Sequence, residues 1–210
     1  MPPLPPLPSA VPAPNDDLDG WYLRGDIGYR INQVASASTT VTADPIADNI
    51  DRSWAIGLGL GVKRNWLRAD FTVDYGAPAK YRGDTAAQPI AYTARIESFT
   101  GLANLYADLG TWYGITPYVG AGAGGSYLRV LDFFTAAAVP PISGPVGGSW
   151  RFSWALMAGV SYGVGRMALD LGYRRLNLGT ARSAANAAGD QLEIKDIVAD
   201  EFRLGMRFAL

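Results

Sequence analysis

Hydrophobic and polar residues alternate strictly at the end of the chain. Between positions 201 and 210, apolar residues fill every even position, and the odd positions hold charged or small residues. This period of two is typical of a β-strand with one apolar and one polar face. About ten residues is also the length that a tilted strand needs to cross a lipid bilayer. The pattern therefore predicts a membrane-crossing strand.

Seven earlier segments show the same alternation, so the chain is expected to form eight strands. Short connections (64–65, 110–114 and 163–166) alternate with long ones (32–52, 76–96, 127–148 and 177–198). In bacterial outer-membrane barrels the short turns face the periplasm and the long loops face outward. Both termini are therefore expected on the periplasmic side. The predicted strands cover residues 21–31, 54–63, 66–75, 97–109, 115–126, 150–162, 167–174 and 201–210.

Charged residues decide which side of these strands faces lipid. A lysine or arginine on the lipid face costs about 2–4 kcal/mol at the bilayer midplane, so the charged parity must face the lumen. Eight strands enclose a bore that side chains can fill. We therefore expect the inward charges to pair across the lumen as a salt-bridged plug, with inward glycines leaving room for long arginines. The predicted network is Arg24, Asp26, Arg30, Lys63, Arg68, Asp70, Asp74, Asp108, Asp170, Arg174, Arg203 and Arg207.

Composition supports one membrane domain preceded by a leader. Of the 210 residues, 49% are hydrophobic and only 18% are charged, and no apolar run is long enough for a transmembrane helix. Residues 1–19 contain seven prolines, which favours an extended polyproline conformation. We predict a flexible periplasmic leader over 1–19 and an all-β, eight-stranded antiparallel up-and-down transmembrane β-barrel over 20–210. A net charge of −1 gives no argument for nucleic acid as a partner.

A soluble lipocalin-like barrel is the main structural alternative. It would point the apolar face inward around a ligand, and periodicity alone does not separate the two folds. Glycines interleaved with charges on one parity favour the membrane barrel, as does the lack of a helix-like segment. So do the aromatic residues near strand ends, because such rings prefer the headgroup level. These aromatics are Trp21, Tyr29, Trp54, Tyr75, Trp150, Tyr162, Tyr173 and Phe208.

Four segments (68–75, 101–109, 116–122 and 169–174) resemble the small eight-stranded outer-membrane proteins of alphaproteobacteria, a porin-like family related to the OmpA transmembrane domain and the opacity proteins. The resemblance covers about residues 20–210 and implies the outer membrane of a Gram-negative bacterium. It also implies that the last strand is the sorting signal read by the barrel-assembly machinery. Such signals usually end on an aromatic residue, whereas this chain ends on leucine. The residues concerned are Phe202, Leu204, Met206, Phe208 and Leu210.

The residue inventory argues against an enzyme. Small outer-membrane barrels that act as acyltransferases, deacylases or proteases depend on a histidine as general base, and this chain contains no histidine. We therefore predict no enzymatic activity, no cofactor and no metal site.

Two groups of residues near the long connections are candidate contact sites. The connection 127–148 is unusually apolar, which suggests a contact site for a surface or envelope protein. Alternatively, the strands extend beyond the bilayer and this segment folds over the barrel mouth. Basic residues at the outer strand ends are candidate contacts for lipopolysaccharide. The apolar group is Leu131, Phe133, Phe134 and Ile142, and the basic group is Lys80, Arg82, Arg95, Arg129 and Arg175.

These features predict a structural outer-membrane protein that contributes to envelope integrity and displays surface loops. Its expected partners are outer-membrane lipid, lipopolysaccharide and the barrel-assembly machinery. Three alternatives remain open: an adhesin or partner-binding surface protein, a narrow pore for small solutes, and a soluble lipocalin-like binder.

Overall fold

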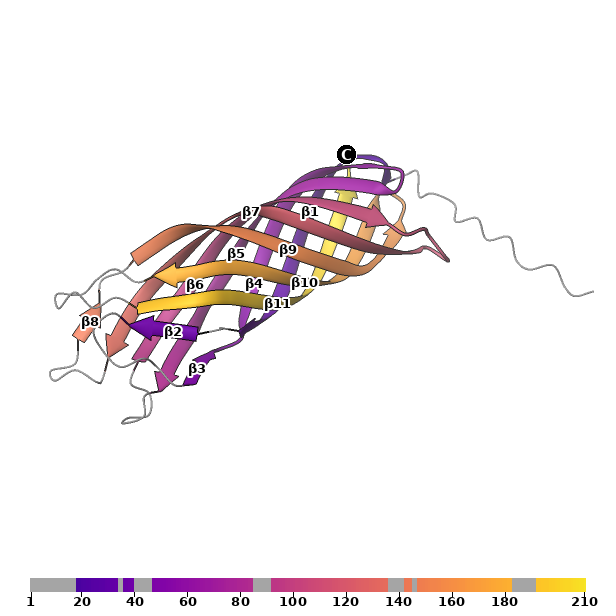
Figure 1. Cartoon of the computed structure of the whole chain (residues 1–210). Coiled ribbons are helices and arrows are strands. Elements are labelled where there is room, and N and C mark those ends of the chain that lie inside the picture. The colour runs from indigo at the N-terminus through magenta and orange to yellow at the C-terminus, as the bar shows by residue number, and fades with distance from the viewer. Residues whose placement is uncertain are drawn as a thin grey trace, which may run out of the picture.

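The computed structural model describes residues 18–33, 36–39, 47–84, 92–135, 142–144, 147–182 and 192–210. Eight long antiparallel strands each pair with the next, and the last pairs with the first, so the sheet closes into a barrel (Figure 1). The predicted fold class is confirmed. The barrel strands are β1 (Gly20–Gln33), β4 (Ser53–Arg64), β5 (Leu67–Asp84), β6 (Tyr92–Asp108), β7 (Ile115–Thr135), β9 (Gly147–Val164), β10 (Met167–Arg182) and β11 (Leu192–Ala209).

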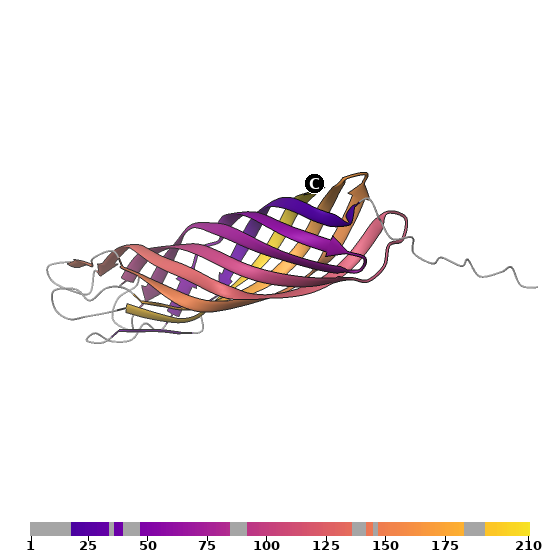
Figure 2. The ribbon, with the colours of Figure 1, turned by 90° about the horizontal axis from the view of Figure 1, so that it is seen from above.

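Tight turns join β4 to β5, β6 to β7 and β9 to β10, as the sequence predicts. Asn65, Tyr113 and Gly165 adopt positive φ angles of 56°, 51° and 55° in these turns. The start of β1 and the C-terminus lie at the same end of the barrel as the turns (Figures 1 and 2). We call this the turn end, and the opposite end the long-strand end. Leu18 is buried there beside Ala168 and Ala209, and the rest of the predicted leader, apart from Asp19, lies outside the described residues.

The strands are longer than the alternation predicted. The connections expected at 76–96 and 177–198 consist largely of strand, because β5 runs on to Asp84, β6 begins at Tyr92, and β10 and β11 extend in the same way. Three short strands continue the wall at the long-strand end: β2 (Ser36–Thr39) pairs with β11, β3 (Ala47–Ile50) with β5, and β8 (Ile142–Gly144) with β7. The predicted long connections are therefore wrong in extent. Within the described residues, no helix is long and apolar enough to cross a membrane.

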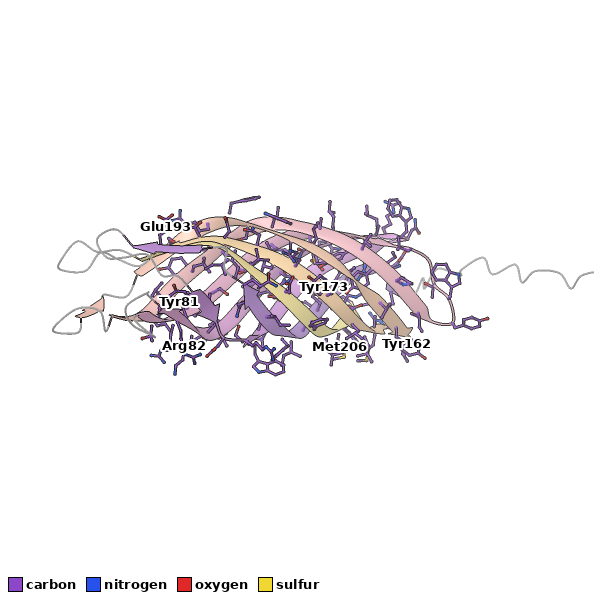
Figure 3. All side chains as sticks on the ribbon, turned by 60° about the horizontal axis from the view of Figure 1, so that its bottom comes forward. Tyr81, Arg82, Tyr162, Tyr173, Glu193 and Met206 are labelled. Carbon is purple, nitrogen blue, oxygen red and sulfur yellow. The ribbon has the colours of Figure 1, made fainter. Side chains whose placement is uncertain are left out.

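The outside of the turn-end half is apolar. Leu58 is 73% exposed and Phe152 70% exposed, and aliphatic residues on every barrel strand point the same way. Figure 3 shows Tyr162 and Met206 projecting outward from this part of the wall. An apolar exterior on a closed barrel fits lipid, since every backbone group of a closed sheet is hydrogen-bonded internally. The lipocalin-like alternative, with its apolar face inward, does not fit this half.

The long-strand half has the opposite arrangement. Its interior is an apolar core, while Lys80 and Arg95 are exposed on the outside. A bulge between Gly76 and Ala79 shifts the inward parity of β5, so that Tyr81 points inward. The charged lumen does not continue into this half, because a wall with a polar exterior has to bury its apolar side chains internally. The core comprises Ile50, Ala79, Tyr81, Ala94, Ile96, Leu102, Leu128, Val130, Ala155, Leu176, Leu178, Ile197 and Ala199.

Candidate functional site: the charged lumen

Charged side chains fill the lumen of the turn-end half. The structure places all twelve residues of the predicted network inside the barrel, and each takes part in an ion pair. None of their side chains is more than 12% exposed. Alternation along each strand delivers them to the interior, because every second residue points there.

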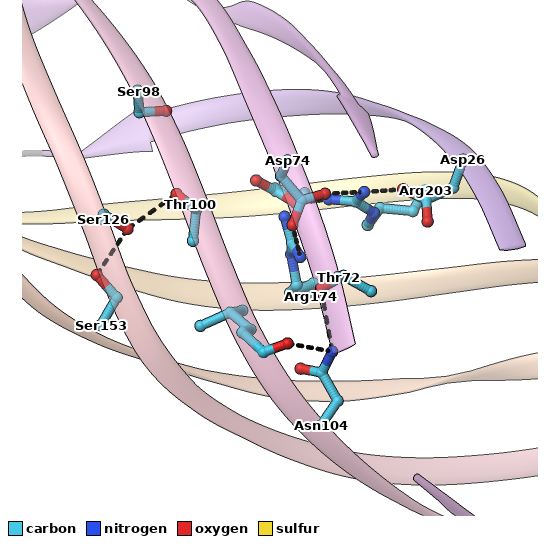
Figure 4. A network of polar contacts seen from close by, with 12 residues as sticks. Asp26, Thr72, Asp74, Ser98, Thr100, Asn104, Ser126, Ser153, Arg174 and Arg203 are labelled. Atoms are coloured by element: carbon cyan, nitrogen blue, oxygen red, sulfur yellow. Dashed lines mark hydrogen bonds and ion pairs between the residues drawn. The ribbon is translucent and has the colours of Figure 1, made fainter. Parts of the chain in front are cut away.

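A central cluster gathers around Glu201, whose side chain is fully buried. Its carboxylate accepts hydrogen bonds from Arg30 Nε at 2.5 Å, Arg174 Nε at 2.7 Å and Arg203 Nη1 at 2.7 Å. Arg174 and Arg203 also donate to Asp74, at 2.8 Å and 2.5 Å (Figure 4). Each carboxylate is thus shared by two or three guanidinium groups from different strands, which ties β1, β5, β10 and β11 together across the lumen.

A second cluster lies nearer the turn end, and Asp26 connects it to the first. Arg203 pairs with Asp26 from one side. Arg24 reaches Asp26 at 3.1 Å with one nitrogen and Asp70 at 2.9 Å with another. Asp70 also accepts hydrogen bonds from the Tyr22 hydroxyl at 2.9 Å and the Asn104 amide at 2.8 Å. These shared acceptors make the two clusters one continuous network.

Arg68 is the most enclosed cation of the second cluster, at 1% exposure. Its guanidinium lies 4.9 Å from the ring centre of Tyr106 and 4.6 Å from that of Tyr118, and it pairs with Asp108 at 2.8 Å. Aromatic faces attract cations, so the two rings replace part of its lost hydration. Arg207 pairs with Asp170 through two nitrogens, at 2.7 Å and 3.1 Å.

The network is electrically balanced. Its ion pairs join seven basic side chains (Arg24, Arg30, Lys63, Arg68, Arg174, Arg203 and Arg207) to seven acidic ones (Asp19, Asp26, Asp70, Asp74, Asp108, Asp170 and Glu201). The sequence prediction omitted Asp19 and Glu201. Glu201 could have been found, because it shares the inward parity of Arg203 and Arg207 in the last strand.

Little space remains between the charged side chains. A cavity of about 20 Å³ is lined by residues of both clusters, among them Arg24, Asp26, Arg174 and Arg203. That volume holds one or two water molecules. Glycines provide the room for the long side chains: a Cβ atom on Gly57 would collide with the side chains of Asp74 and Arg203. The lumen is therefore packed rather than open.

The ion pair nearest the turn end joins β4 to Asp19, which directly precedes β1. Lys63 Nζ is 2.6 Å from Asp19 Oδ1, and the backbone N–H of Asn65 donates to the same carboxylate at 2.9 Å. Partial burial of Asp19 disfavours its charged form, but these two donors outweigh it and hold the pKa of Asp19 below its ordinary value. This pair anchors the segment before β1 to the β4–β5 turn.

Carboxylates pair with several of the basic residues predicted to contact lipopolysaccharide. Arg82 pairs with Asp51, Arg129 with Glu97, and Arg175 with Asp200. Lys80 and Arg95 are exposed and face each other directly across β5 and β6. All five thus lie in the long-strand half.

The predicted apolar contact segment is partly strand. Leu131 is half-buried in β7, and the backbones of Phe133, Phe134 and Ile142 form a hairpin of β7 with β8. The side chains of these last three lie outside the described part of the structure. The outward residues of the last strand are all exposed on the apolar face, namely Phe202, Leu204, Met206, Phe208 and Leu210.

A closed eight-stranded wall, an apolar outer belt and an ion-paired lumen define a transmembrane β-barrel of the outer-membrane type. Within the described residues, no group of three or more acidic, histidine or cysteine side chains is placed to hold a metal ion. The chain is 32% identical over 207 residues to an uncharacterized protein of Brucella suis biovar 1, covering 81% of this chain and 72% of the relative. A similar protein of Brucella abortus is 31% identical over the same length. The chain belongs to the family of these Brucella proteins.

Solved structures show the same fold. OprG from Pseudomonas aeruginosa superposes with a TM-score of 0.59 at 15% identity, over 91% of this chain and 97% of that one. Neisserial surface protein A gives 0.55 at 19% identity, over 91% and 98%. AlkL, solved in lipid bilayers, gives 0.55 at 17% identity, over 99% and 96%. No family model matches the chain.

Proposed function

We propose that this protein is a non-conducting structural barrel of the outer membrane, which contributes to envelope integrity and presents its long-strand end at the cell surface. The observation that carries the proposal is the balanced network of seven basic and seven acidic side chains. A hydrated ion passing the lumen would have to break several buried ion pairs, and breaking one such pair costs about 3–5 kcal/mol.

The proposal includes an orientation. Short turns of outer-membrane barrels face the periplasm, so the turn end, with Asp19 and the C-terminus, would face the periplasm. The long-strand end, whose outer surface carries Lys80 and Arg95, would project into the lipopolysaccharide layer. The last strand would present Phe208 to the barrel-assembly machinery.

Conductance in planar bilayers tests the closed lumen. The wild-type barrel should show no single-channel steps at either polarity. A variant with Arg174→Ser and Arg203→Ser, which removes two bridging side chains, should show them if it still folds. Recurrent steps from the wild-type protein would instead establish the narrow-pore alternative.

Envelope integrity is tested in cells that lack the protein. These cells should become more sensitive to detergents and to bulky antibiotics, and the wild-type gene should restore resistance. Unchanged sensitivity would contradict the role in envelope integrity and favour the adhesin alternative. That alternative is tested by deleting residues 130–142, which should then abolish binding to a surface partner. Val130 itself is buried inside the barrel, so a shorter deletion of 136–140 is the better first variant.

A further inference from the structure

The three tight turns at the turn end differ in their chemistry. The β4–β5 turn exposes Arg64 and Asn65, and the β9–β10 turn exposes Arg166. The hairpin that joins β6 to β7 is different, because residues 109–116 include no charged side chain. This hairpin also projects farther from the barrel than the other two turns (Figures 1 and 2). It is therefore the part of the turn end that reaches its surroundings first.

The end of this hairpin is apolar and exposed. Tyr113 is fully exposed, and Trp112 is exposed beside it. Leu109 and Ile115, on the two arms of the hairpin, are exposed as well. We call these four residues the aromatic tip. Exposed apolar groups gathered in this way mark contact sites.

The aromatic tip is rigid, and its backbone is strained. Trp112 and Ile115 exchange both backbone hydrogen bonds at 2.9 Å, which leaves Tyr113 and Gly114 as a two-residue loop. The φ angles of these two residues are 51° and 80°. A loop with two positive φ angles strongly prefers Asn, Asp or Gly at its first position, and a bulky residue there is unfavourable. The turn alone does not account for a tyrosine at 113, and such outliers point to a function.

The aromatic tip continues the lipid-facing surface of the barrel. Leu109 and Ile115 are exposed, like Val119 further along the outside of β7. Gly114 lies against the ring of Tyr162, since a Cβ atom on this glycine would come within 3.1 Å of it. Tyr162 projects outward from the same wall (Figure 3). The apolar exterior thus runs onto the tip without a charged side chain in between.

We infer that the aromatic tip anchors the barrel at the boundary between headgroups and acyl chains, in the leaflet that surrounds the turn end. Tryptophan and tyrosine favour this level, because the ring is apolar while its polar group reaches water. Without charge, the tip enters the boundary at no cost for desolvating an ion. The anchor goes beyond the proposed function and holds for either orientation of the barrel.

The β9–β10 turn provides the matched comparison. It pairs with the same neighbourhood of the wall, since the backbone N–H of Gly163 donates to the carbonyl of Gly114 at 3.3 Å. Its Arg166 guanidinium lies 5.6 Å from the ring centre of Phe208 and carries a charge that resists burial in lipid. We therefore expect this turn to stay in water beside the inserted tip.

The test measures the depth of the two turns in a bilayer. The chain contains no cysteine, so Tyr113→Cys and Arg166→Cys each place one nitrobenzoxadiazole probe on the full-length protein in phosphatidylcholine vesicles. A lipid with a nitroxide near the ester end of its acyl chain quenches probes at the boundary, and iodide quenches probes in water. The probe at 113 should emit further to the blue and be quenched several-fold more by the lipid than the probe at 166. Iodide should give the reverse order.

Each outcome decides the inference. Equal access of iodide to both positions would overturn the anchor. Equal quenching of both probes by the nitroxide lipid would overturn the assignment to the aromatic tip, because the whole turn end would then lie at the boundary. If Tyr113→Cys does not fold, Trp112→Cys carries the probe while keeping Tyr113 and Gly114. Neither quencher reports on conductance, so failure of the anchor is distinguishable from failure of the closed lumen.

Discussion

Neutralising Glu201 tests whether the lumenal network stabilises the barrel. The substitution Glu201→Gln keeps the size of the side chain but removes the charge that three arginines share, at 2.5 Å, 2.7 Å and 2.7 Å. The central cluster would then hold three cations and only the carboxylates of Asp26 and Asp74. Since the site is fully buried, little water is available to replace the lost interaction.

The expected loss in the free energy of unfolding is large. Removing one partner of a buried ion pair costs about 3–5 kcal/mol, because it leaves an uncompensated charge. With a urea dependence of about 2 kcal/mol per molar, a loss of about 3 kcal/mol lowers the urea midpoint by about 1.5 M. Unfolding from lipid vesicles can be followed by fluorescence, because the chain has six tryptophans.

Two matched variants separate charge from general damage. Asp51→Asn breaks an exposed ion pair, since the side chains of Asp51 and Arg82 are 40% and 42% exposed. It should lower the free energy of unfolding by less than about 1 kcal/mol. The double variant Glu201→Gln with Arg30→Gln restores the charge balance and should recover part of the lost stability. If Glu201→Gln alone stays within about 1 kcal/mol of the wild type, the network is not what stabilises the lumen.

Three other predictions concern single sites. Gly124→Ala should lower the free energy of unfolding by about 1–3 kcal/mol, because its Cβ would collide with a backbone carbonyl of β6. Gly125→Ala, whose Cβ would make only ordinary contacts, should be nearly neutral, and equal costs for the two variants would refute the packing argument. The pKa of Asp19 is lowered in the folded state, so its stabilisation should be present above the unfolded value of about 3.9 and disappear as the pH falls through the lower folded value. Asp19→Asn should therefore have a lower urea midpoint than the wild type at pH 7, and the two midpoints should converge once the pH falls below the folded pKa of Asp19. A difference that stays constant with pH would contradict this. Phe208→Ala should reduce the heat-modifiable, assembled fraction in cells more than Phe202→Ala, which lies on the same face further from the C-terminus, and equal fractions would count against a sorting role.

The alternation in the sequence predicted the turn-end half well. It identified the inward parity of Arg24, Arg68 and Arg203, since one face of each strand there meets lipid and the other cannot. It also located the tight turns, because the β4–β5 turn needs only Asn65 and one neighbour. These features depend on local spacing, which a single sequence shows directly.

The alternation failed at the long-strand half for a physical reason. In that half, apolar residues such as Leu128 and Leu176 point inward and charges such as Arg129 point outward, the reverse of a lipid-facing wall. After Tyr75 the sequence no longer alternates as a lipid-facing strand would. The bulge that follows Gly76 also changes which residues of β5 point inward. The sequence therefore suggested loops where the strands continue.

The sequence by itself determined the barrel: eight alternating segments, their turns, and a lumen that must hold balanced charge because lipid excludes it. Only the tertiary structure decided which charges meet. Glu201 contacts arginines from three different strands, and Arg68 lies between two tyrosine rings, because barrel closure and stagger bring together residues far apart in the chain. It also decided where the apolar side chains change from the outside of the wall to the inside, since that change depends on bulges and on how neighbouring strands combine.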